Sequence, residues 1–194
     1  MTGNRGNMGK EEPQKRTVAL VALGANLGDA EGNIHAALQL LAATPGIWIL
    51  KTSSLIKTEP VGGPVGQPCY FNGAVLIETT VDPYGLLDEL HQIENKLGRV
   101  RNVVWGPRTV DLDLIIYGDV QTFTEELTLP HPRLYWRRFV LDPACEIAPE
   151  LTVPTTGLSL EETRRLLIAT CSHFELFSIL LQRVIRAGTT ETLP

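Results

Sequence analysis

Two aspartates stand two residues apart in the segment WGPRTVDLDL, which spans residues 105–114. We expect a β-strand at 109–117, and because side chains alternate between the faces of a strand, Asp111 and Asp113 should share one face, roughly 7 Å apart. The alternate residues are apolar and should point into the core: Val110, Leu112, Leu114 and Ile116. Two carboxylates on one face repel each other, and Mg²⁺ is a natural cation between them because it prefers oxygen ligands. An exposed polar strand face is the alternative that the strand alone leaves open.

Arginines on both sides of this strand favour the metal interpretation. Three precede it (Arg99, Arg101 and Arg108) and three follow it (Arg133, Arg137 and Arg138). Guanidinium groups bind phosphate oxygens through paired hydrogen bonds. Carboxylates for a metal beside arginines for phosphate are the usual groups of phosphoryl transfer, in which catalysis is mostly positioning and charge neutralisation. We expect either Arg133 or Arg138 to be a solvated surface residue, because the neighbours Arg137 and Arg138 should not point the same way.

A histidine and several aromatic residues complete the candidate set. His131 lies in the rigid turn LPHP at 129–132, where we expect it to donate a hydrogen bond to phosphate rather than act as a base; a structural role is the alternative. Tyr70, Trp105 and Phe139, with Asn72, could hold a flat heterocycle by stacking and by amide hydrogen bonds to its edge. Core packing is the alternative. The sequence carries neither a phosphate-binding P-loop nor a nucleophilic serine or cysteine motif.

The elements that must position these residues follow from hydrophobic patterning. Strands are predicted at 17–23, 47–57, 71–80 and 109–117, and helices at 30–43 and 82–97. This βαββαβ order predicts an α+β, ferredoxin-like fold, an antiparallel sheet with two helices on one face. The C-terminal part predicts a helical extension: a short helix or extended segment at 136–147 and helices at 160–168 and 174–186. We divide the chain into a disordered lead-in at 1–16, a domain at 17–170, and a helix and tail at 171–194.

Bulk composition narrows the class of function. The 194 residues carry a net charge of −5, which argues against a general binder of nucleic acid or of acidic membranes, because such proteins need an excess of basic residues. Three widely spaced cysteines without metal-ligand spacing fit free thiols in a reducing cytosol. The polar N-terminus is no signal peptide, and no apolar run has the length of a membrane span. We therefore expect a cytoplasmic enzyme acting on small molecules.

Several segments together resemble one enzyme family. They are GANLGD (24–29), YFN (70–72), GRVR (98–101), WGPRTVDLDL (105–114), LPHPR (129–133) and RFVL with EIAPEL (138–151). In order and spacing this set resembles 6-hydroxymethyl-7,8-dihydropterin pyrophosphokinase, from about Val18 to about Ile168. The resemblance implies a ferredoxin-like α+β fold, two Mg²⁺ ions, ATP as the donor, and AMP and a pterin diphosphate as products in folate biosynthesis.

The resemblance also assigns residues by position. Asp111 and Asp113 match the metal ligands, and Arg99 and Arg108 match catalytic arginines. Residues that match ATP contacts are Glu94, Arg101, Leu114, Thr128, His131 and Arg137. Residues that match pterin contacts are Thr58, Val61, Tyr70, Asn72, Trp105 and Phe139, with Tyr70 and Phe139 stacking on the two faces of the ring. The chain departs from the family pattern at Ala25, His91, Val104 and Tyr135–Trp136.

Two other classes of function remain open from the sequence. One is a non-catalytic, nucleotide-binding ferredoxin-like module that regulates a partner, although such a module has no need of metal ligands. The other is a two-metal nuclease or phosphatase, which would hydrolyse without an acceptor. For the enzyme we expect a monomer, and we expect the loop at 99–107 to be mobile in the free protein and to close over both substrates.

Overall fold

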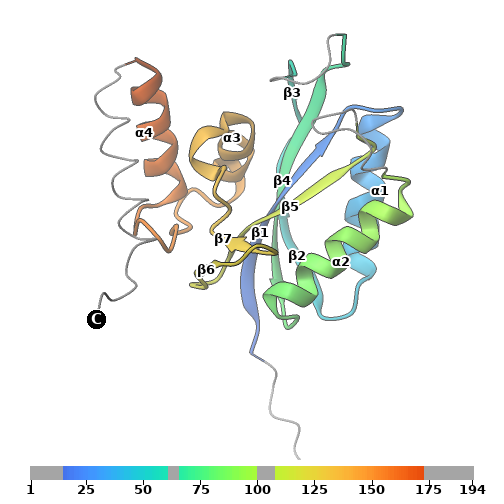
Figure 1. Cartoon of the computed structure of the whole chain (residues 1–194), viewed down its shortest axis with the longest axis horizontal. Helices are drawn as coiled ribbons and strands as arrows, with labels where there is room; N and C mark the ends of the chain where they lie inside the picture. Colours follow the sequence, from blue (N-terminus) through green and yellow to red (C-terminus); the bar gives the residue numbers. More distant parts are fainter. Residues whose placement is uncertain (1–14, 61–65, 100–107, 173–194) are drawn as a thin grey trace, which may run out of the picture.

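The computed structural model describes residues 15–60, 66–99 and 108–172 (Figure 1). Residues 1–14 of the predicted lead-in, most of the predicted mobile loop and the predicted helix at 174–186 lie outside these ranges. Arg16, at the end of the predicted lead-in, forms an ion pair with Glu78 at 3.3 Å. The core elements follow the predicted βαββαβ order, except that the predicted strand at 47–57 is divided into two: β1 (Thr17–Ala25), α1 (Ala30–Ala43), β2 (Ile47–Thr52), β3 (Ile56–Thr58), β4 (Tyr70–Thr79), α2 (Pro83–Lys96) and β5 (Asp111–Tyr117). The C-terminal elements are β6 (Thr122–Phe123), β7 (Thr128–Leu129), the short 3₁₀ helix η1 (Leu134–Trp136), α3 (Arg138–Ile147) and α4 (Leu160–Ser172).

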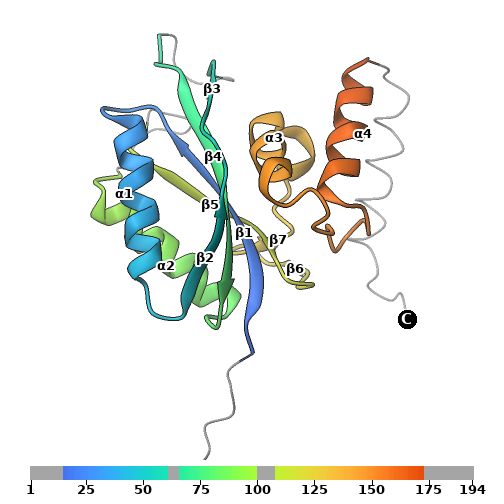
Figure 2. The same cartoon turned by 180° about the vertical axis from the view of Figure 1, so that it is seen from behind.

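The main sheet is antiparallel, with the strand order β2-β4-β1-β5 and β3 added beside β4. Helices α1 and α2 cover one face of the sheet, whereas α3 covers the other and α4 packs outside α3 (Figures 1 and 2). The ferredoxin-like α+β prediction is confirmed. The segment at 136–147, for which helix and extended structure were both open, forms η1 and α3.

Two apolar cores hold these layers together. The first lies between the sheet and α1 with α2, and includes Ile34, Leu90 and Leu112. The second lies between the sheet and α3 with α4, and includes Leu20, Leu141 and Leu160. Since both faces of the sheet are covered, β1 is buried over most of its length, as its continuous apolar run TVALVAL predicts.

Helix ends follow local sequence signals. The Asp29 carboxylate accepts the backbone N–H of Gly32 at 3.0 Å before α1, and Asp82 accepts those of Tyr84 and Gly85, each at 3.1 Å, before α2. Gly98 follows α2 with a φ of +76°, a conformation that glycine adopts without a Cβ clash. These caps fix where each helix leaves the sheet.

Two strand predictions are wrong in detail. Ile116 packs in the second core rather than beside Leu112, because a β-bulge opposite Leu20 and Val21 leaves Ile115 unpaired and reverses the side-chain alternation. The predicted strand at 47–57 is interrupted at 53–55, where Ser53 Oγ accepts the backbone N–H of Ala74 at 2.9 Å. The chain resumes as β3, which pairs with the start of β4.

No helix in the described ranges is long and apolar enough to cross a membrane.

Candidate active site

The two aspartates project from β5 over a floor of small residues. Asp111 pairs with Gly24 of β1, and Gly24 pairs in turn with Asn72 of β4; Asp113 pairs with Ala22. A Cβ atom built on Gly24 would lie 3.5 Å from Asn72 Oδ1 and 3.8 Å from Asp111 Cβ. The absent side chain at Gly24 therefore leaves open the space between the carboxylate and the amide.

Guanidinium groups enclose Asp111. Its two carboxylate oxygens form ion pairs with Arg99, which follows α2, and with Arg108, just before β5. Glu94 of α2, which is only 1% exposed, also pairs with Arg99, and its Oε1 accepts the backbone N–H of Leu112 at 2.8 Å. Glu94 thus joins α2 to β5 between the two aspartates and fixes the position of Arg99.

The negative charge of Asp113 is compensated by fewer positive groups than that of Asp111. Its carboxylate lies 3.6 Å from the guanidinium of Arg137, and its side chain is 33% exposed. Burial, together with the negative charge of Asp111, raises the pKa of Asp113 from 3.8 to about 6. An additional cation near this carboxylate would relieve the cost of its charge.

The donor set fits a hard divalent cation that shares its coordination sphere with a ligand. Asp111 and Asp113 offer carboxylate oxygens on one face of β5. In the described part of the chain, no cluster of three or more His, Cys, Asp or Glu side chains could hold a metal by itself. Mg²⁺ binds through one or two carboxylates and completes its shell with water and phosphate oxygens. The pair is therefore suited to Mg²⁺ that arrives with a phosphate compound.

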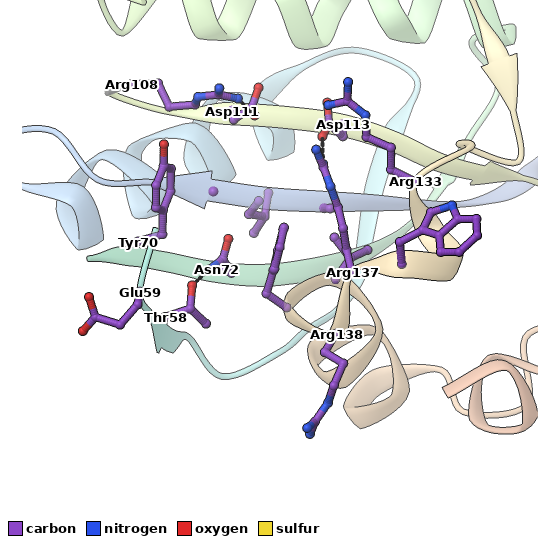
Figure 3. A pocket seen from close by; sticks show the side chains of 16 residues that line it. Thr58, Glu59, Tyr70, Asn72, Arg108, Asp111, Asp113, Arg133, Arg137 and Arg138 are labelled. Carbon is purple, nitrogen blue, oxygen red and sulfur yellow. Dashed lines mark hydrogen bonds and ion pairs between the residues drawn. The ribbon is translucent and has the colours of Figure 1, made fainter. Parts of the chain in front are cut away.

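A first cavity of about 560 Å³ opens on the α3 side of the sheet (Figure 3). Thr58, Tyr70 and Asn72 line one end of it, and Phe139 of α3 also lines it. The Asn72 amide, on a residue only 6% exposed, donates to Thr58 Oγ1 at 2.8 Å, which fixes its orientation. Aromatic rings with an oriented amide are suited to a planar, polar heterocycle.

A second cavity of about 420 Å³ lies on the other side of the aspartates. It is lined by residues of α2, β5, β7 and the turn that follows β7, among them Glu94, Arg99, Leu114, Thr128 and His131. Asp111 and Asp113 line both cavities. A reacting group in one cavity can therefore meet a group in the other at the carboxylate pair.

His131 is electrically neutral at physiological pH. Burial, with the positive charges of Arg137 and Arg133, lowers its pKa to about 4. Its Nδ1 accepts the backbone N–H of Arg133 at 3.1 Å, so the proton of the neutral ring lies on Nε2. The ring can donate that N–H to a ligand in the second cavity.

The structure brings most of the sequence-predicted residues together in two groups. Residues in the first cavity are Thr58, Tyr70, Asn72, Arg108, Arg137 and Phe139, and those in the second are Glu94, Arg99, Leu114, Thr128 and His131. Arg137, matched to ATP by resemblance, lines the first cavity and not the second. Val61, Arg101 and Trp105 lie outside the described residues.

Asn26 holds two segments of the site in place through hydrogen bonds, and it was not among the predicted site residues. It is 3% exposed, its Oδ1 accepts the backbone N–H of Arg108 at 2.9 Å, and its Nδ2 donates to Gln67 at 3.4 Å and to the carbonyl of Pro68 at 3.3 Å. It joins the segment before Tyr70 to the segment before β5. The only sequence signal is an asparagine in the GANLGD turn, which by itself is typical of any turn.

Known proteins resemble the chain in sequence and in fold. A family model described as 7,8-dihydro-6-hydroxymethylpterin-pyrophosphokinase matches residues 20–149. The 2-amino-4-hydroxy-6-hydroxymethyldihydropteridine pyrophosphokinase of Bacillus subtilis is 41% identical over 145 residues, which are 75% of this chain and 86% of the relative. The enzyme of the same name from Haemophilus influenzae is 43% identical over 143 residues, 74% of this chain and 89% of the relative.

A solved structure supports the fold alone. The HPPK-DHPS protein of Plasmodium falciparum, crystallised with pteroate, superposes with a TM-score of 0.65 at 14% identity. The match covers 86% of this chain but 45% of that longer chain. The sequence matches confirm the resemblance: the chain belongs to the 7,8-dihydro-6-hydroxymethylpterin-pyrophosphokinase family.

Proposed function

We propose that this protein transfers the pyrophosphoryl group of ATP to 6-hydroxymethyl-7,8-dihydropterin, and so releases AMP and the pterin diphosphate for folate biosynthesis. The single observation that carries the proposal is the carboxylate pair Asp111 and Asp113 shared by two cavities of different character. One cavity has aromatic rings and an oriented amide. The other has a neutral histidine donor and arginine. Two substrates can thus meet at one pair of carboxylates.

The first cavity is the proposed acceptor site. Tyr70 and Phe139 would stack on the pterin, and the Asn72 amide, held by Thr58, would hydrogen-bond to its polar edge. Because the Asn72 amide is already oriented, little side-chain freedom is lost on binding. Val61 and Trp105 are assigned to this site from the family motif.

The second cavity is the proposed donor site. Thr128, Leu114 and His131 would contact ATP, with His131 donating its Nε2–H to a phosphate oxygen. Glu94 would act mainly by holding Arg99 and the backbone at Leu112. Arg101 is assigned to this site from the family motif.

We infer that Asp111 and Asp113 hold two Mg²⁺ ions together with the phosphates of ATP. When bound, such ions neutralise charge on the phosphate oxygens and hold donor and acceptor in line. Arg99 and Arg108 contact Asp111, and both would lose this contact and could turn toward phosphate oxygens when Asp111 binds metal. Metal binding would thus free the Arg108 guanidinium for the substrate, whereas Arg99 would keep its ion pair with Glu94.

The reaction itself balances simply. The hydroxymethyl oxygen of the pterin bonds to the β-phosphorus of ATP, and the bond from that phosphorus to the oxygen bridging the α-phosphorus breaks. AMP leaves with the bridging oxygen, and the hydroxyl proton is released. The chain's own contribution is to orient both partners and to hold cationic groups around the transferred phosphates.

We also propose that the enzyme acts as a monomer in the cytoplasm. Residues of a single chain line both cavities, and Cys69 and Cys145 are free thiols. Gel filtration should give one species near the chain mass of 21.3 kDa. A stable larger species would contradict the monomer.

The test of the function is incubation with ATP, Mg²⁺ and the reduced hydroxymethylpterin, followed by separation of nucleotides. AMP should form only when all three components are present, and Asp111→Asn should form it far more slowly. A non-catalytic module would form none, and a phosphatase or nuclease would hydrolyse its substrate without the pterin. Either outcome would refute the proposal.

A further inference from the structure

The bend between β2 and β3 is held by the C-terminal turn of α3. The Glu146 carboxylate accepts two hydrogen bonds from Ser54, one from its backbone N–H at 2.9 Å and one from its hydroxyl at 2.6 Å. The Lys51 ammonium donates to the carbonyl oxygen of Ile147 at 3.1 Å. These hydrogen bonds join segments that lie 92 or 96 residues apart in sequence.

The stability of α3 by itself does not account for a glutamate at this position. Glu146 lies in the last turn of α3, where the helix dipole disfavours a negative charge and favours a cation such as Lys51. The hydroxyl and the backbone N–H of Ser54 lower the pKa of Glu146 below its usual value, so the contact stabilises the charged carboxylate. Glu146 therefore contributes to the contact with the bend rather than to the helix.

The two joined segments lead to two walls of the first cavity. Phe139 and Glu146 are seven positions apart on α3, so they share one face of the helix, about 10 Å apart along its axis. Ser54 precedes Thr58 by four positions, about 13 Å of extended chain. Phe139 and Thr58 both line the first cavity, and α3 contacts β3. Glu146 thus joins the two segments at the end away from the cavity.

The separation between these two walls decides how well a flat ring fits. Thr58 accepts the Asn72 amide at 2.8 Å and so fixes the group proposed to bind the ring edge (Figure 3), whereas Phe139, proposed to stack on the ring, belongs to α3. A ring that stacks on one wall and hydrogen-bonds to the other binds well only if both walls keep a fixed separation.

We propose that Glu146 is a positioning residue of the acceptor site, which through Ser54 sets the separation between Phe139 and the Thr58–Asn72 pair. This inference rests on the proposed function and adds to it a residue outside the site. Glu146 is not among the described residues that line either cavity, so it acts only through its contact with the bend. Its loss should therefore affect the pterin and not ATP, whose proposed site lies on the other side of the aspartates.

Calorimetric titration of the full-length protein with the pterin and with ATP, each alone, tests this inference. Glu146→Ala should weaken pterin binding by about fivefold to tenfold and leave ATP binding unchanged, because both hydrogen bonds to the bend are lost. Ser54→Ala deletes one of the two and should cost about threefold. Glu146→Gln should retain part of the affinity, since its amide oxygen can still accept the backbone N–H of Ser54. The matched control is Glu150→Ala, at an exposed glutamate just beyond α3.

Two further measurements distinguish positioning from a general loss of stability. The double variant Ser54→Ala/Glu146→Ala should lose no more pterin affinity than Glu146→Ala alone, because both changes break the same contact. In steady-state kinetics, Glu146→Ala should raise the KM for the pterin while kcat at saturating pterin stays within about twofold of the parent.

The outcomes separate this inference from the proposed function. If Glu146→Ala binds the pterin like the parent, or loses ATP affinity to the same degree, the inference is wrong while the proposed function stands. It is also wrong if Glu150→Ala loses as much pterin affinity as Glu146→Ala. Should Glu146→Ala fail to fold, Ser54→Ala decides in its place, and unchanged pterin affinity there contradicts the inference. A parent protein that binds no pterin would refute the proposed function, and the inference with it.

Discussion

Replacing Asp113 by asparagine should stabilise the metal-free protein at neutral pH, although it removes an ion pair. The folded protein raises the pKa of this carboxyl from 3.8 to about 6, through burial and the nearby charge of Asp111, while Arg137 at 3.6 Å offsets only part of the effect. The charged carboxylate is therefore held in an environment that disfavours it. Asparagine has a similar shape without the charge.

The size and the sign of this change in the free energy of unfolding follow from proton linkage. Because the pKa is higher in the folded than in the unfolded state, the folded protein binds more protons between about pH 4 and pH 6, and its free energy of unfolding falls as the pH rises through that window. The full shift corresponds to about 3 kcal/mol at 1.36 kcal/mol per pKa unit. Since the side chain is 33% exposed, solvent screening reduces the expected gain in Asp113→Asn to about 1–2 kcal/mol above the window.

Urea unfolding in the presence of a metal chelator measures this difference. Asp113→Asn should exceed the parent in stability at about pH 7.5 and match it at about pH 4. Asp111→Asn is the matched control and should be less stable than the parent, because it leaves Arg99 and Arg108 facing no carboxylate at that position. If Asp113→Asn is less stable than the parent at neutral pH, or if its gain is the same at both pH values, our reading of the site's electrostatics is wrong.

Three further predictions concern individual contacts. Phe139→Ala and Asn72→Ala should each weaken pterin binding by about tenfold or more while ATP binding changes little, as calorimetry with each ligand would show; equal loss of ATP affinity would mean that they are core residues. His131→Ala should weaken ATP binding by the same factor at about pH 6 and pH 7.5, because its pKa of about 4 keeps the ring neutral at both; a loss that grows toward pH 6 would show a protonated ring. Glu94→Gln should lower the free energy of unfolding by about 2 kcal/mol, because Arg99 loses a buried carboxylate, and unchanged urea unfolding would contradict this.

Much of the fold could be predicted because its signals are local. The apolar run of β1, the caps at Asp29 and Asp82, and the alternation around Asp111 and Asp113 each depend on residues close in sequence. The reversal at Ile116 could not be predicted, since the bulge depends on how β5 pairs with β1. The interruption at Ser53 likewise depends on a contact with β4.

The candidate site was predictable in its residue types but not in its arrangement. The family motif groups Arg137 with ATP contacts, yet the anchored turn of η1 directs it into the first cavity. Asn26 and Glu94 hold their neighbours through hydrogen bonds to backbone groups far away in sequence, at Arg108 and Leu112. Such contacts leave no periodic pattern, so only the folded chain reveals them.

The central claim is that two phosphates move together from ATP to the pterin. ATP labelled separately at the α-, β- and γ-phosphorus, incubated with Mg²⁺ and the reduced hydroxymethylpterin, tests it most directly. We predict that the β- and γ-labels appear together in the pterin product and that the α-label remains in AMP. A product that carries the γ-label alone, with ADP released, or labels found only in free phosphate or pyrophosphate, would contradict the account.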